Sequence, residues 1–258
     1  VEEAIRKGWA PSSDKINIAS AFTNDDGNYD WAEGYFRYFR QHQLMVDREP
    51  FTVKMMMENL RDHYSEEMRN CLPYGVAAAK LPTICCHAGG IDGCVTAASA
   101  VCSLDGREEG PFKFVYWGSM ASPCCSIFRP NFNINWLPED LKDAGELYDE
   151  KSQWWTFIEL ERYISLNYEL FAPTVRQKFS ELENEFIEQV DDLKKNYNGD
   201  VNKLKEFSMY ANKESFMLAK DLLHGVKQKI NKKNMDYLLA DYFKKAAECC
   251  GMKHSLEF

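Results

Sequence analysis

The chain of 258 residues contains no apolar run of 18 or more residues, so no segment has the composition of a membrane-spanning helix. Its opening, "VEEAIRKGWAPSS", lacks the apolar core of a secretory signal. We therefore expect a cytoplasmic or otherwise intracellular protein with no membrane partner. The alternative that a leader was removed before Val1 is left open. The sequence also has no internal repeat and no low-complexity linker, which favours a globular chain with its own core.

Positive charge is scarce except near the C-terminus. The chain carries a net charge of −9, yet the residues from Lys194 onward contain 13 lysines, no arginine and 8 acidic residues. The preceding part is therefore strongly acidic and would repel phosphates, which excludes non-specific nucleic-acid binding by the main body. The lysine-rich end is more typical of solvated helix faces than of a site for an anionic partner.

The nine cysteines include no C-x₂-C pair, which most structural zinc sites contain. Four of them, with one of the five histidines, lie in "TICCHAGGIDGCVTAASAVCSLDG" (83–106). Cys85, Cys86 and His87 are adjacent and cannot all face one ion from one strand, so we predict no metal and no cofactor. A catalytic cysteine–histidine pair, such as Cys94 and His63, is left open as an alternative, although the sequence around the cysteine matches no known nucleophile signature. Most cysteines are interpreted as reduced, buried, small core residues.

The pattern of apolar residues changes twice along the chain. Helical spacing in "WAEGYFRYFRQHQLM" (31–45) and "TVKMMMENL" (52–60) predicts two helices, the second capped by Thr52. Residues 94–104, 111–120 and 124–134 then alternate and predict three consecutive antiparallel strands. Because these strands carry little charge on either face, we expect the sheet to be covered on both sides.

The remainder of the chain, from residue 138 onward, has helical spacing. An apolar stripe at Leu182, Phe186 and Val190 continues to Tyr197, and Gly199 is expected to end that helix. Pro173 should break or kink the segment before it. Two further amphipathic helices are predicted over 201–224 and 234–250.

The order of these segments resembles the later half of the secernin and cysteine-dipeptidase family over residues 1–170. A helix ending in Leu60-Arg61-Asp62 precedes the Thr- and Ser-rich strand "VTAASAVCSL", and a hairpin partner runs into "SPCCSIFRPNF" (122–132). The helical "LYDEKSQWWTFIELER" follows, and the opening "AIRKGWAPSSDKINIASAF" is also similar.

This resemblance implies an α+β fold of the N-terminal-nucleophile hydrolase type, an αββα sandwich of antiparallel sheets between helical layers. Residues 1–172 would form the second half of that hydrolase domain, and 173–258 would be a helical extension packed on it. The family's nucleophile, a cysteine exposed by processing, would lie upstream, because Val1 offers an α-amine but no nucleophilic side chain. Candidates for the substrate edge are His87, Thr96 and Ser99.

The expected function is that of a processed chain of a cysteine-type dipeptidase or related amidohydrolase, inactive as this chain alone. Its partners would be a companion N-terminal chain or segment and a small peptide or amide substrate, and homo-oligomerisation is left open. The alternative is a non-catalytic, secernin-like interaction protein, because a fold does not guarantee an activity.

Overall fold

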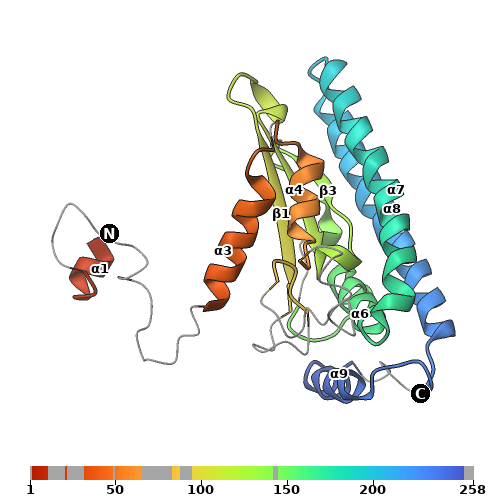
Figure 1. The fold of residues 1–258 in the computed structure, drawn as a ribbon. Coiled ribbons are helices and arrows are strands. Elements are labelled where there is room, and N and C mark those ends of the chain that lie inside the picture. Colours follow the sequence, from red (N-terminus) through yellow and green to blue (C-terminus); the bar gives the residue numbers. More distant parts are fainter. Residues whose placement is uncertain are drawn as a thin grey trace. The chain divides into compact units, whose positions relative to one another are not determined.

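The computed structural model describes residues 2–10, 21, 32–48, 50–64, 83–87, 95–141 and 145–252 (Figure 1). The chain divides into two compact units, 1–36 and 37–258. In the first unit, helix α1 (Glu2–Arg6) buries Ala4 and pairs Arg6 with Glu3. The second unit contains the sheet, the long helices and the candidate site.

Three antiparallel strands form one sheet in the order β1-β2-β3, which confirms the predicted hairpins. The strands are β1 (Ala98–Leu104), β2 (Phe114–Met120) and β3 (Arg129–Phe132). Val101 lies opposite Trp117, and Val115 lies opposite Phe132. These β-branched and aromatic pairs pack well across neighbouring strands, which explains why the sheet forms here.

Helices make up most of the described chain. They are α3 (Ala32–Met45), α4 (Val53–Leu60), α6 (Gln153–Ser165), α7 (Tyr168–Lys195), α8 (Val201–Lys229) and α9 (Tyr237–Cys249). Side chains cap several of them: Thr52 accepts a hydrogen bond from the Met55 amide, as predicted, and Asp200 and Asp236 cap α8 and α9. Among the described helices, none has the length and apolar composition needed to cross a bilayer.

The helix break after α6 lies earlier than the sequence predicts. Helix α6 ends at Ser165 with Leu166 as its C-cap, and Asn167 caps α7 by accepting a hydrogen bond from the Leu170 amide. Pro173 lies inside α7, in its second turn, where the loss of one backbone donor did not end the helix. The expected domain boundary between 172 and 173 therefore falls within α7, and both sides of it belong to the unit 37–258.

The helices cover one face of the sheet. Helix α4 packs against β1, α6 against β2, and α7 and α8 against β3 (Figure 1). Residues on this face, such as Val101, Val115 and Trp117, are buried. The alternate residues point the other way, and Leu104 and Tyr116 are 73% and 39% exposed.

The expectation that both faces are covered is therefore not met within the described part of the chain. The sequence pattern shows that both faces are apolar, but it does not show what lies against each of them. The predicted stripe of α7 does pack inward: Phe186 is fully buried beside α8, where Leu204 is also buried. Helix α9 buries Phe243 under the guanidinium of Arg162 from α6.

Candidate functional site

Four side chains with metal-binding atoms converge at the edge of the core: His63, Cys85, His87 and Cys124. One nitrogen or sulfur atom from each lies within 4.8 Å of the other three. The Nε2 atom of His87 is 3.1 Å from Nε2 of His63, 3.5 Å from Sγ of Cys85 and 3.1 Å from Sγ of Cys124. Cys85, His87 and Cys124 are buried, and His63 is half-buried.

The extended segment 83–87 supplies two of these groups from one side. Successive side chains of an extended chain point in opposite directions, so Cys85 and His87 face the cluster and Cys86 faces away. The Cys86 sulfur instead accepts a hydrogen bond from Arg37 at 3.3 Å. The segment is held by Thr96, whose hydroxyl accepts from the Cys86 amide at 2.9 Å and whose amide donates to the Cys86 carbonyl at 3.1 Å.

His63 is positioned by the turn that follows α4. Arg40 binds both carboxylate oxygens of Asp62, at 2.7 and 2.6 Å, and the Asp62 carbonyl accepts a hydrogen bond from the Cys85 amide at 3.3 Å. Tyr64 adopts a positive φ of 60°, a conformation that non-glycine residues rarely take. These constraints fix the histidine next to the segment that carries Cys85.

Cys124 lies in the short 3₁₀ turn Pro123–Cys125, directly after β2. Two arginines fix this turn, because the Pro123 carbonyl accepts from Arg61 at 2.9 Å and from Arg176 at 3.3 Å. Arg61 follows α4 and Arg176 belongs to α7, so the turn is tied to two helices. The sulfur of Cys124 therefore has a fixed place in the core.

Glu161 of α6 lies behind His87, and the Tyr168 ring contacts both histidines of the cluster. The Oε1 atom of Glu161 is 3.2 Å from Nδ1 of His87 and also accepts hydrogen bonds from the hydroxyls of Ser122 and Ser165, at 3.4 and 3.3 Å. A carboxylate can only accept hydrogen bonds, so Nδ1 of His87 carries the proton. Nε2, the other ring nitrogen, faces the remaining three groups of the cluster.

The electrostatics of the cluster favour a thiolate at Cys124. Burial raises the pKa of this thiol, but hydrogen bonds from the Cys125 and Cys85 thiols and the charge of His87 outweigh it, and the pKa lies well below its usual value. Burial lowers the pKa of His87, but the adjacent Cys124 and Glu161 outweigh it and raise the pKa to about 10.

Two kinds of chemistry use such a set of groups. Cys124, His87 and Glu161 follow the order of a thiol–imidazole–carboxylate triad. A nucleophile must reach its substrate, however, and Cys124 is only 4% exposed. The four converging donors, three of them buried and one half-buried, are instead typical of a structural metal site.

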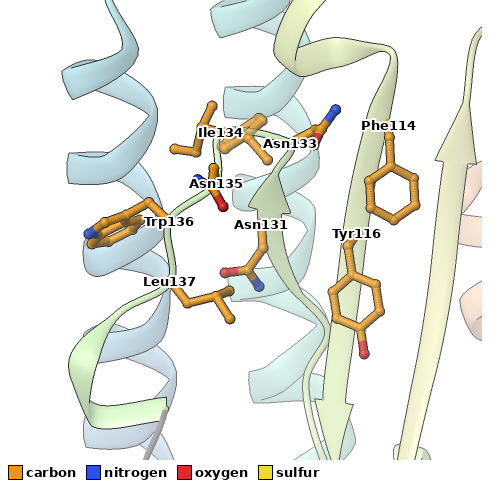
Figure 2. A pocket seen from close by; sticks show the side chains of 9 residues that line it. Phe114, Tyr116, Asn131, Asn133, Ile134, Asn135, Trp136 and Leu137 are labelled. Carbon is orange, nitrogen blue, oxygen red and sulfur yellow. The ribbon is translucent and has the colours of Figure 1, made fainter.

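A second feature lies on the uncovered face of the sheet. An open groove of about 660 Å³ runs between β2, β3 and the segment that follows β3. Figure 2 shows Phe114 and Tyr116 projecting from β2 and Asn131 from β3, while Trp136 and Leu137 lie beyond the end of β3, with helices behind the sheet. The Tyr116 ring lies across Gly118, where an added Cβ would come within 2.8 Å of it.

The structure separates the three predicted substrate-edge residues. His87 belongs to the buried cluster, and Thr96 holds the segment that carries it. Ser99 lies on β1 opposite Ser119, on the face that the helices cover. Cys94, named in the sequence analysis as a partner for His63, lies outside the described residues.

Sequence reasoning missed Cys85, Cys124 and Glu161 as members of this site. The available signal was the Cys-x-His spacing of Cys85 and His87, which places two donors on one side of an extended chain. The objection that three adjacent residues cannot face one ion holds for Cys86 and not for its neighbours. Comparison of the chain with protein-family models, curated proteins and solved structures finds no match.

Proposed function

We propose that this chain forms the second half of a cysteine-type amidohydrolase with the N-terminal-nucleophile αββα fold. Its substrates would be dipeptides or related small amides, and a companion segment would supply the nucleophilic cysteine. The observation that carries the proposal is the half-covered sheet, which resembles one sheet and one helical layer of a four-layer sandwich. Secernins and cysteine dipeptidases are the family that the order of sequence motifs resembles.

The uncovered face has the composition of a buried sheet interface. On β1 and β2 the side chains that alternate with the helix-facing ones are small or apolar: Ala98, Ala100, Cys102, Leu104, Phe114, Tyr116 and Met120. On β3 the same face carries the polar Asn131 and the buried Arg129. Two sheets that pack face to face lie about 10 Å apart, with such residues interdigitating between them. A second antiparallel sheet would therefore convert the exposed apolar surface into core.

The substrate edge would lie where the companion sheet meets the start of β1. Thr96 stays a candidate there, since it is half-buried and carries a hydroxyl group that can hold a polar substrate. Ser99 is also half-buried, but its side chain lies on the face that the helices cover, which makes it less suited to a site between two sheets. His87 is less suited to contact substrate, because its two nitrogens already face Glu161 and the sulfur atoms of the cluster. In this proposal the cluster supports the fold and the companion segment brings the thiol.

The second candidate is a non-catalytic interaction protein with the same architecture. It is favoured by exposed apolar side chains on the C-terminal helices, where Leu238 is 84% exposed, Tyr237 59% and Met217 50%. Such residues are common at surfaces that bind other proteins. This candidate needs no companion thiol and no substrate.

Cys102 provides the test, because it is exposed on the open face of the sheet. Protein prepared from its natural source would be compared with the purified chain by intact mass, by the rate of Cys102 alkylation and by dipeptide hydrolysis. We expect a companion chain, slow Cys102 labelling and hydrolysis only in the natural preparation. Cys249, exposed at the end of α9, should label equally in both and serves as the control.

Each other result has a definite meaning. A companion and Cys102 protection without hydrolysis would favour the interaction protein. Rapid Cys102 labelling in the natural preparation, with no companion mass, would refute the half-sandwich and with it the proposed hydrolase.

A further inference from the structure

We propose that His63, Cys85, His87 and Cys124 bind one divalent metal ion of the zinc type in a closed tetrahedral site. This inference is independent of the proposed hydrolase activity. It rests on the convergence of four donor atoms and on the hydrogen-bonded carboxylate behind His87.

The three donor distances that involve His87 are close to the edges of a zinc tetrahedron, and the other three are at most 4.8 Å. Zinc binds nitrogen at about 2.0–2.1 Å and thiolate sulfur at about 2.3 Å, so a tetrahedral site separates two nitrogens by about 3.3 Å and a nitrogen from a sulfur by about 3.6 Å. The structure gives 3.1 Å between the two Nε2 atoms and 3.5 and 3.1 Å from Nε2 of His87 to the two sulfurs. An ion at the centre requires movements of only a few tenths of an ångström along these edges.

The protonation pattern also suits a metal. Because Nδ1 of His87 donates to Glu161, Nε2 is the nitrogen that points at the centre of the cluster, and a bound metal ion would replace the proton there. A carboxylate–histidine pair of this kind orients metal-binding histidines and increases the electron density of the ligand. A cation would pair with all four donors at once, whereas hydrogen bonds alone would require protons to be shared among crowded lone pairs.

The choice of metal follows from the ligand set and its burial. Two imidazoles and two thiolates in a tetrahedron are typical of zinc, and hard ions such as Mg²⁺ and Ca²⁺ prefer oxygen ligands. Four protein ligands fill the coordination sphere, which is typical of structural rather than catalytic zinc. The ion would tie the end of α4, the segment 83–87 and the turn after β2 into one unit.

The experiment uses the full chain, purified under reducing conditions, freed of metal by a chelator and titrated with Zn²⁺ and with Co²⁺. We expect one ion per chain, and for Co²⁺ the intense visible absorption and sulfur-to-metal charge-transfer band of a tetrahedral thiolate site. Cys85→Ser should remove the charge-transfer contribution of one thiolate and weaken binding by at least tenfold. Cys86→Ser is the matched control, because the Cys86 sulfur faces away from the cluster and bonds with Arg37 instead. This variant should bind the metal ion as tightly as the parent chain does.

Two further variants keep the test decisive if Cys85→Ser fails to fold. His63 is half-buried at the end of a helix, so His63→Ala should fold and still lose the four-coordinate cobalt spectrum. Glu161→Gln should weaken zinc binding by roughly 10–100-fold while keeping the same spectrum, since second-shell carboxylates act at that level. A parent chain that takes up no ion at one-to-one stoichiometry, or equal binding by the Cys85 and Cys86 variants, would overturn the proposal.

Discussion

Replacement of Glu183 by glutamine should destabilise the fold severely. Glu183 of α7 is 3% exposed, and its Oε2 atom accepts hydrogen bonds from Arg61 at 2.6 Å and from the Phe128 amide at 2.9 Å. Arg176 lies 3.6 Å from its second oxygen. One carboxylate therefore pairs with two guanidinium groups and connects the end of α4, α7 and the segment before β3.

The expected loss of stability is large because the groups involved are buried. Arg61 is only 7% exposed, so Glu183→Gln leaves its charge with the exposed Glu58, 3.7 Å away, as its remaining acidic partner, and the new amide group would point one of its donors at a guanidinium. Removing one partner of a buried ion pair costs about 3–5 kcal/mol. For a domain of this size, that loss should lower the melting temperature by roughly 6–20 °C.

The assay is urea and thermal unfolding followed by far-UV circular dichroism, at fixed metal content. Glu181→Gln is the matched control, because Glu181 lies on the same helix but is exposed and contacts only Lys178 and Gln177. Its loss should change the free energy of unfolding by no more than about 0.5 kcal/mol. A Glu183→Gln variant within about 1 kcal/mol of the parent chain would show that the network does not hold these elements together.

Four further outcomes are expected. In the isolated chain, Cys102 should react with an alkylating agent far faster than the buried Cys125, and equal rates would contradict the open sheet face. Truncation after Gly199 should unfold the chain, because α8 packs against both α6 and β3, and a truncated chain that melts like the parent would show that α8 is dispensable. Chelation should lower the unfolding midpoint if the metal site exists, since free metal at 100 times its Kd adds about 2.7 kcal/mol, and an unchanged midpoint would count against a structural ion. Finally, the purified chain should not hydrolyse dipeptides. Robust turnover that is abolished by substituting one of its own cysteines would refute the proposal that a companion segment supplies the nucleophile.

The sequence predicted the local elements well, because their signals are local. Alternation gave the three strands in their order, and the capping side chain of Thr52 marked the start of α4. The predicted stripe through Phe186 and Val190 is buried along α7. Pro173 does not end α7, so of the two predicted outcomes the break is wrong, because a proline in the second turn of a helix costs one hydrogen bond and packing can outweigh that cost; the kink stays a prediction.

The site was harder to predict, because its members lie far apart in the chain. His63, Cys85 and Cys124 meet only through tertiary packing, which no spacing rule for short metal motifs describes. The cysteines likewise do not behave as one class. Among the seven described, Cys85, Cys124 and Cys125 are buried, as expected for core residues, whereas Cys102 and Cys249 are exposed.

The two proposed sites lie on different surfaces of one sheet, and this separates their consequences. Cys85 and Cys124 belong to the same buried core as Trp117, on the face that the helices cover. Tyr116, the next residue along β2, points to the open face. Loss of the metal should therefore loosen the turn after β2 and the end of α4, and it should leave the open face as apolar as before. Cys102 reactivity in the isolated chain should accordingly stay high with and without metal, while protection of Cys102 should depend on the companion segment alone.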